Sequence, residues 1–184
     1  PVAEAAFIVC EVLHLHPDQF ETFATARVTA AEARQIFDVI EKRVSTRKPA
    51  AYLVNRIYMH GMPFYVDERT IVPRSFIGEL LDSHFSGGDG ALIDDPLAVE
   101  SVLDLCTGSG CLAILAARAF PNARSDGVDL WMDALAGGGR NVADYGRGDR
   151  GPAYRGDRCK PRRGTRYERR SSSPAWGEWQ GMCG

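Results

Sequence analysis

Apolar residues recur at helical spacing in the first 48 residues of the chain. Two sets of such positions repeat every three or four residues: Val2, Ala6, Val9, Val12 and Leu13, and then Ala33, Ile36, Phe37, Ile40 and Val44. Between them, Pro17 suits the first turn of a helix and Thr29 suits an N-cap, because its hydroxyl can accept a hydrogen bond from an unpaired backbone amide. We therefore predict a small helical domain over residues 1–48.

The hydrophobic period shortens in the next segment, residues 49–85. Two short strands are predicted at residues 56–60 and 63–66, joined at Gly61 as a hairpin. A helix is predicted over residues 75–85. This segment is expected to form a linker with a hairpin and one helix.

From residue 86 onward the pattern changes again. A connector rich in glycine, aspartate and proline (86–96) precedes an apolar run at 101–105 that we predict to be a strand. A glycine turn, a helical run at 111–120 and a second predicted strand at 124–129 follow. A strand, helix and strand within about 30 residues form the building block of a doubly wound parallel sheet. The sequence therefore predicts an α/β fold for this part of the chain.

The pattern weakens after this unit. Residues 132–146 predict a helix that is interrupted at residues 137–139, because each of these three glycines costs about 1 kcal/mol relative to alanine. Where two further strands would follow, the segments GPAYRGD and RYERRSSSP are too polar for buried strands. We therefore expect residues 86–184 to form a partial domain, with its sheet cut short after the place of a fourth strand.

Composition and charge narrow the class of protein. The 184 residues are 45% apolar and 25% charged with a net charge of -2, which is typical of globular proteins. Residues 1–130 carry 18 acidic against 11 basic side chains, and residues 131–184 carry 6 against 11. The overall balance favours no nucleic-acid partner. The apolar opening contains Glu4 and Glu11 and lacks a basic leader, so we expect neither a signal peptide nor a membrane span.

The cysteines and histidines follow no pattern typical of a metal site. The five cysteines contain no C-x-x-C pair, and the four histidines show no metal-ligand spacing with them. We therefore expect no metal, no disulfide framework and a cytoplasmic protein. Cys106 and Cys111 flank the glycine turn, where we interpret them as small packing residues rather than nucleophiles.

The glycine turn DLCTGSG, residues 104–110, has the most specific chemistry. Its glycines fit the dinucleotide pattern G-x-G-x-x-[GA], and Asp129 lies near the spacing of a ribose-binding acid. However, Asp104 lies four residues before Gly108, whereas a dinucleotide pattern begins its glycines directly after the strand. This spacing favours S-adenosylmethionine, whose amino-acid end a glycine turn and a helix N-terminus can accommodate. A dinucleotide site and a simple tight turn are the alternatives.

Two sequence blocks carry a family resemblance. They are PAAYLVNRIYMHGMPFYVDERTIVPRSFIGELL (49–81) and VLDLCTGSGCLAILAARAFPNARSDGVDL (102–130). In this order and at this separation, they closely resemble the protein N(5)-glutamine methyltransferases. The segment FYVDERTIVPRS is similar to the branch that modifies the third protein of the large ribosomal subunit, rather than to the branch that modifies release factors.

The resemblance implies a fold, a cofactor and a substrate. The fold is a helical substrate-recognition domain, a hairpin linker and a Rossmann-like class I S-adenosylmethionine-dependent methyltransferase domain. The cofactor is S-adenosylmethionine and the partner is a large-subunit ribosomal protein, with no membrane and no direct nucleic-acid binding expected and the oligomeric state left open. The implied site residues are Asp104, Thr107, Gly108 and Gly110 at the methionine end, Asp129 at the ribose, Asp157 at the adenine and Arg74 at the substrate entrance.

The family's acceptor motif, Asn-Pro-Pro-Tyr, departs from its usual form in this chain. It falls at Ser173, Pro174, Ala175 and Trp176, so only a proline is retained. An amide nitrogen is a poor nucleophile, and the site must align it with the methyl group and accept its hydrogens. Ser173 offers a shorter acceptor than asparagine, and Trp176 keeps an aromatic surface. We therefore expect a protein-glutamine methyltransferase of reduced activity, with a release-factor methyltransferase and an inactive binding module of the same fold as alternatives.

Overall fold

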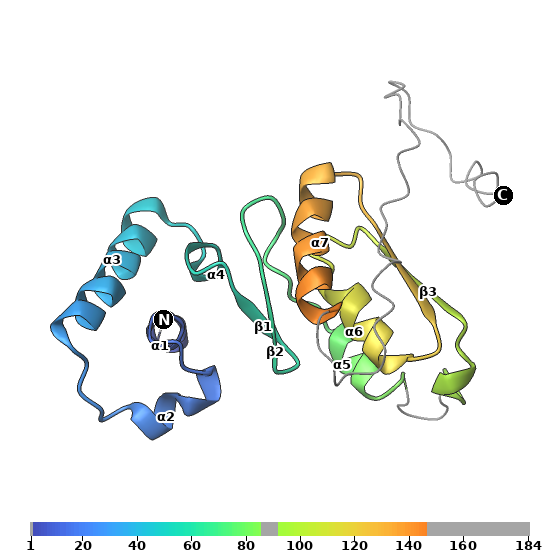
Figure 1. Ribbon diagram of the computed structural model, residues 1–184, viewed down its shortest axis with the longest axis horizontal. Helices are drawn as coiled ribbons and strands as arrows, with labels where there is room; N and C mark the ends of the chain where they lie inside the picture. Colours follow the sequence, from blue (N-terminus) through green and yellow to red (C-terminus); the bar gives the residue numbers. More distant parts are fainter. Residues whose placement is uncertain (1, 86–91, 147–184) are drawn as a thin grey trace.

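Helices form the N-terminal part of the protein (Figure 1). The computed structural model describes residues 2–85 and 92–146. The first elements are α1 (Val2–Val12), a short 3-10 helix (Pro17–Gln19), α2 (Phe20–Phe23), α3 (Ala30–Thr46) and α4 (Ala50–Leu53). All but α4 lie within the first 48 residues, where the apolar spacing predicts helices.

The start of α3 follows the predicted cap. The Thr29 hydroxyl accepts a hydrogen bond from the Glu32 amide at 3.3 Å, and the Glu32 carboxylate accepts one from the Thr29 amide at 2.6 Å. This reciprocal pair satisfies two backbone donors that a helix start leaves unpaired. Pro17 also occupies the first turn of its 3-10 helix, so both predicted helix-start residues are confirmed.

The predicted hairpin and the helix after it are present but shorter than expected. Strands β1 (Ile57–Met59) and β2 (Met62–Phe64) pair antiparallel around the turn at Gly61, whose φ is +71°. The next helix, α5 (Ile77–Asp82), is shorter than the predicted 75–85. It ends early because His84 and Phe85 take positive φ angles, which a right-handed helix excludes.

The strand, helix and strand predicted around the glycine turn are confirmed. Strand β3 (Ser101–Leu105), helix α6 (Cys111–Ala119) and strand β4 (Arg124–Val128) follow one another, and β3 pairs in parallel with β4. Figure 1 shows α6 packed beside this pair. Together with the N-terminal helices, this arrangement makes the fold mixed α/β.

Helix α7 (Met132–Gly146) is continuous, so the predicted interruption at its three glycines is wrong. Gly138 is buried, and a Cβ atom placed on it would lie 3.3 Å from the carbonyl oxygen of Gly108. The missing side chain therefore lets α7 approach the glycine turn closely. This tertiary packing outweighs the weak helix propensity of the glycines.

One hydrophobic core joins the hairpin to the α/β unit. Its buried members come from β1, β2, α5, α6 and the residue after α6: Met59, Met62, Phe64, Leu81, Cys111, Ile114, Leu115, Ala116 and Phe120. Helix α7 closes the same side, since the rings of Tyr145 and Phe64 lie 5.2 Å apart and the Tyr145 hydroxyl donates to the Pro63 carbonyl. The hairpin is therefore packed against the unit that carries the glycine turn.

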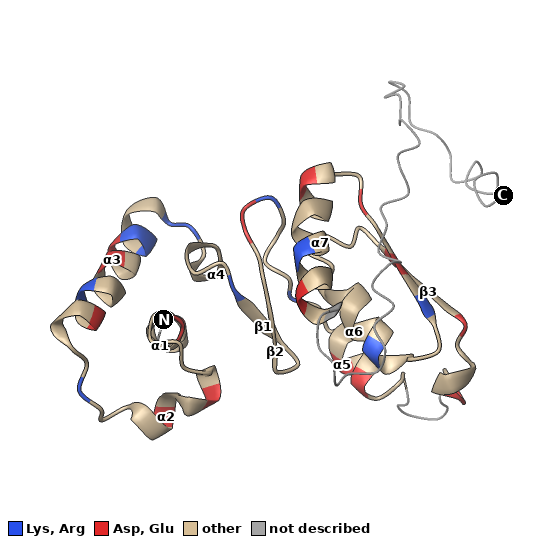
Figure 2. Cartoon of the chain, in the orientation of Figure 1, with Lys and Arg blue, Asp and Glu red and all other residues tan. Residues whose placement is uncertain are grey.

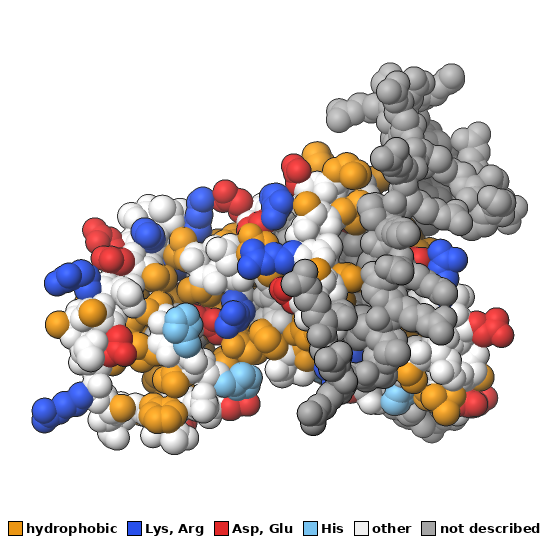
Figure 3. Space-filling model, viewed as in Figure 1, with side chains coloured by type: hydrophobic (Ala, Val, Ile, Leu, Met, Phe, Trp, Pro, Cys, Tyr) orange, Lys and Arg blue, Asp and Glu red, His pale blue; other side chains and the backbone are white. Residues whose placement is uncertain are grey.

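The surface of the described residues mixes both charges with apolar patches. Acidic and basic residues are interspersed along α3 (Figure 2). Hydrophobic side chains also reach the surface among the N-terminal helices (Figure 3), where Phe23, Val28 and Phe37 are exposed. Within residues 2–85 and 92–146, no helix has the length and hydropathy needed to cross a membrane.

Candidate cofactor site

The site begins at Asp104, one residue before the end of β3. Its Oδ2 atom accepts a hydrogen bond from the Thr107 hydroxyl at 2.6 Å and another from the backbone amide of Ala113 in α6 at 3.1 Å. Both bonds go to the same oxygen. In the part of the chain that the structure describes, Oδ1 makes no hydrogen bond, so it is available to a ligand.

The environment of Asp104 disfavours its negative charge. Partial burial is the main cause and raises the pKa of this carboxyl, and the nearby Asp129 charge acts in the same direction. The hydrogen bonds from Thr107 and Ala113 act in the opposite direction but are outweighed. Neither aspartate forms an ion pair with a lysine or arginine in the described ranges. A ligand with a positive charge would therefore suit this position.

The turn after β3 requires an unusual backbone conformation. Cys106, Gly108 and Gly110 have φ angles of +59°, +57° and +77°, in the left-handed region that favours glycine. Gly110 is the N-cap of α6, so the helix begins directly at the turn. The turn is closed by a hydrogen bond from the Gly110 amide to the Thr107 carbonyl at 2.9 Å. The N-terminus of α6 therefore lies beside the turn, and the partial positive charge of a helix N-terminus favours a negatively charged ligand group.

Asp129 follows β4 and connects the two strand ends. Its Oδ2 accepts a hydrogen bond from the Gly108 amide at 2.9 Å, and its Oδ1 accepts one from the Trp131 amide at 2.9 Å. Each carboxylate oxygen can accept a second bond, so the side chain can still bind a ligand. The structure thus brings together five predicted site residues: Asp104, Thr107, Gly108, Gly110 and Asp129.

The remaining predicted site residues are placed less fully. Arg74 is exposed in the segment between the hairpin and α5. That segment passes beside the turn, because a Cβ atom placed on Gly108 would lie 3.9 Å from Thr70. The other predicted residues lie outside the described residues: Asp157, Ser173, Pro174 and Trp176. Their roles stay predictions.

The two cysteines beside the turn differ from each other. Cys111 is buried, and burial raises the pKa of its thiol to about 11, so it is a packing residue as predicted. Cys106 is exposed, so its prediction as a packing residue is wrong. The reason is its place in the turn, where the chain has left β3 and has not yet entered α6.

Two residues of α7 contact the turn and were missed by the sequence analysis. Gly138 lies against the Gly108 carbonyl, and the side chain of Asn141 donates a hydrogen bond to the Ser109 carbonyl at 2.8 Å. The available signal in the sequence was that Gly138, a small residue, and Asn141, with its side-chain carboxamide, lie three positions apart in one helix and therefore on the same face.

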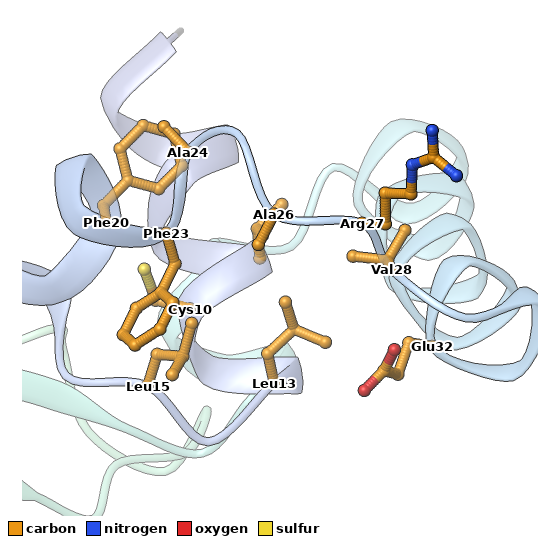
Figure 4. Close-up of a pocket in the computed structure, with 11 residues that line it drawn as sticks. Cys10, Leu13, Leu15, Phe20, Phe23, Ala24, Ala26, Arg27, Val28 and Glu32 are labelled. Atoms are coloured by element: carbon orange, nitrogen blue, oxygen red, sulfur yellow. The ribbon is translucent and has the colours of Figure 1, made fainter.

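A separate cavity lies among the N-terminal helices (Figure 4). Its volume is about 270 Å³ and its lining is mostly apolar: Val9, Cys10, Leu13, Leu15, Phe20, Phe23, Ala24, Ala26, Arg27, Val28 and Glu32. In Figure 4 the guanidinium of Arg27 points away from the apolar side chains. The cavity is lined by α1 and the segment after it, by α2, by the loop before α3 and by the first turn of α3. It shares no residue with the glycine turn.

The amino-acid sequence of the chain is similar to that of several curated proteins. No protein-family model matches the chain. It is 63% identical over 186 aligned residues to the ribosomal protein uL3 glutamine methyltransferase of Bradyrhizobium diazoefficiens. The alignment covers 100% of this chain and 58% of that protein. It is 53% identical over 158 residues to the protein of the same name from Burkholderia pseudomallei, covering 86% of this chain and 50% of that one.

A third relative with this name, from Bordetella pertussis, is 52% identical over 147 residues, covering 80% of this chain and 48% of its own. The chain therefore spans about half the length of the curated relatives that it matches. These names confirm the resemblance to the glutamine methyltransferases, and they favour the ribosomal-protein branch over the release-factor branch.

Proposed function

We propose, from this similarity along the whole chain, that the protein transfers a methyl group from S-adenosylmethionine to the side-chain amide of a glutamine in ribosomal protein uL3. The observation that carries the proposal is the 63% identity to a named uL3 glutamine methyltransferase over the full chain. The geometry of the glycine turn supports the choice of cofactor.

The charges around the turn suit S-adenosylmethionine better than a dinucleotide. Asp104 and Asp129 are two half-buried carboxylates without a cationic side chain as partner in the described ranges. A pyrophosphate would add negative charge beside them, whereas S-adenosylmethionine carries an ammonium and a sulfonium. The open Oδ1 of Asp104 would accept from the ammonium group, and the amides at the start of α6 would face the carboxylate.

The remaining cofactor contacts belong to the same proposal. Thr107, Gly108 and Gly110 let the backbone approach the methionine end, and Asp129 accepts from the ribose hydroxyls. Asp157 is proposed to lie at the adenine amino group. The bound cofactor supplies an electrophilic methyl group, so the protein's own task is to orient an amide nitrogen toward it and exclude water.

The acceptor side is proposed from family position. Ser173 and Pro174 would accept the hydrogens of the substrate amide, Trp176 would pack against the substrate, and Arg74 would lie at its entrance. The proposed architecture is a helical recognition domain (1–48), a hairpin linker (49–85) and a Rossmann-like methyltransferase domain (86–184). We place the activity in the cytoplasm, where ribosomal proteins are made and assembled.

Binding and transfer are tested separately with the purified protein. S-adenosylhomocysteine should raise its melting temperature and NAD should not; stabilisation by NAD instead would overturn the cofactor proposal. Transfer is then measured with labelled S-adenosylmethionine and unmethylated uL3, with a release factor as the comparison substrate. Label on a uL3 glutamine, located by peptide mass spectrometry, is expected. Binding of the cofactor without transfer to uL3 would overturn the enzyme proposal.

A further inference from the structure

Asn141 of α7 is the most deeply buried polar side chain that the structure describes, with 1% of its surface exposed. Its Nδ2 donates hydrogen bonds to the carbonyls of Ser109 at 2.8 Å and Tyr65 at 2.9 Å, and its Oδ1 accepts one from the Tyr65 amide at 2.7 Å. These bonds use both hydrogens of the carboxamide. Two carbonyls and one amide as partners also define which end of the side chain is which.

The three bonds connect two segments far apart in the sequence. Ser109 lies between Gly108 and Gly110 in the glycine turn, residues 104–110, which we call the cofactor turn from here on. Tyr65 directly follows β2. The Tyr65 ring is further held by the guanidinium of Arg140, which lies 3.8 Å above its centre. A single side chain of α7 therefore ties the exit of the hairpin to the cofactor turn.

The other residues on this face of α7 are small, which lets the helix pack closely against the turn. Ala134 and Gly138 are buried on the same side as Asn141, at helical spacing. Gly138 brings the helix axis against the turn, and Asn141, one turn later, supplies the directional bonds. Tight packing and fully paired polar groups together define one position for the Ser109 carbonyl.

We propose that Asn141 is a positioning residue for the cofactor turn. It holds the Ser109 carbonyl and the Tyr65 backbone in one arrangement, so that the turn from Gly108 to Gly110 already has its conformation when S-adenosylmethionine arrives. The proposal rests on the proposed function for the identity of the ligand. It concerns a residue that acts through the turn and does not itself touch the ligand.

The proposal is tested by Asn141→Asp, which keeps the size of the side chain but replaces its donor group. A carboxylate would face the carbonyls of Ser109 and Tyr65 without a hydrogen to donate. We expect affinity for S-adenosylhomocysteine, measured by calorimetry, to fall about tenfold, because buried carbonyls lose their partners. Amide hydrogen exchange in the peptides containing Tyr65 and Ser109 should become faster.

Val142→Ala is the matched control, because Val142 is the next residue and packs on the hydrophobic core instead of the turn. It should lower the melting temperature while leaving the affinity unchanged. Asn141→Ser, whose short hydroxyl cannot reach both carbonyls, replaces the first variant if that one does not fold. Unchanged affinity and unchanged exchange in the Asn141 variants would overturn the proposal. A wild-type protein that does not bind S-adenosylhomocysteine would instead overturn the proposed function, and the exchange comparison would still test the positioning role.

Discussion

The backbone amide of Gly108 donates a hydrogen bond to the carboxylate of Asp129 across the ends of β3 and β4. The same carboxylate also accepts from the Trp131 amide at the start of α7. The side chain of Asp129 therefore connects the ends of both strands to the start of α7. This arrangement explains how a short parallel pair can hold a turn in a conformation that includes three positive φ angles.

Asp129→Asn should weaken both the turn and cofactor binding. An asparagine has one acceptor oxygen and one donor group, so it cannot accept from both Gly108 and Trp131 as the carboxylate does. We expect a stability loss of about 1–3 kcal/mol in urea denaturation and at least tenfold weaker binding of S-adenosylhomocysteine by calorimetry (about 1.4 kcal/mol). The control is Asp133→Asn, because Asp133 is an exposed carboxylate in the first turn of α7. It should change neither the stability nor the affinity for S-adenosylhomocysteine much. Equal behaviour of the two variants would contradict this role for Asp129.

Gly138 and Gly139 provide a matched pair within α7. A Cβ atom on Gly139 would meet nothing within 4 Å, so Gly139→Ala should stabilise the protein by about 1 kcal/mol through helix propensity alone. A Cβ atom on Gly138 would lie 3.3 Å from the Gly108 carbonyl, which forces the helix or the turn to shift. Gly138→Ala should therefore gain less stability or lose some, and should weaken binding of S-adenosylhomocysteine. Urea denaturation and calorimetry on both variants measure this, and identical results for the pair would show that the close approach does not matter.

Asp104 is predicted to cost stability in exchange for binding. Its pKa is raised in the folded protein, so between the unfolded and folded pKa values the folded state binds more protons and stability rises as the pH falls. Above both values the ionised carboxylate is a net cost. Asp104→Asn removes that cost and keeps the hydrogen bonds from Thr107 and Ala113, because both go to one oxygen that the carboxamide retains.

The Asp104→Asn variant should therefore be at least as stable as the wild type at pH 7, and this advantage should disappear toward about pH 4, near the ordinary value for aspartate. It should also lose most affinity for S-adenosylhomocysteine, because the neutral amide cannot pair with an ammonium. Asp38→Asn on the exposed side of α3 serves as control. Urea denaturation at the two pH values measures the stability of the variant, and calorimetry at pH 7 measures its affinity for S-adenosylhomocysteine. A variant that is less stable at neutral pH but not at acidic pH would reverse the sign and contradict the prediction.

Local patterns were sufficient to predict the unit around the turn. The apolar run of β3, the glycines after it and the helical run of α6 are all short-range signals, and the structure places them, and the parallel strand β4 after them, as expected. The capping residue Thr29 is a similar case, because its partner Glu32 lies only three positions away. For the candidate site, the residues near the turn could be placed together for the same reason.

The long-range features could not be predicted in this way. The continuity of α7 depends on packing between Gly138 and a turn 30 positions earlier, whereas propensity records only what each glycine costs. Asn141 bonds to Tyr65, which lies 76 positions away, and nothing near either residue indicates the pairing. The exposure of Cys106 likewise depends on where the turn leaves the strand. The acceptor residues from Ser173 to Trp176 stay predictions.

The cysteines allow a test of the turn by chemical labelling. Cys106 is exposed beside Thr107, whereas Cys10 and Cys111 are buried and burial raises the pKa of both thiols. Because the thiolate is the reactive form, iodoacetamide should label Cys106 in the native protein well before Cys10 or Cys111. Peptide mapping by mass spectrometry reads each site separately, and labelling in urea, where all three should react, is the control. S-adenosylhomocysteine should slow the reaction at Cys106 and NAD should not, because the bound ligand would cover and order the turn. Labelling of Cys111 as fast as that of Cys106 in the native protein would contradict the described packing, and protection by NAD alone would favour the dinucleotide interpretation of the turn.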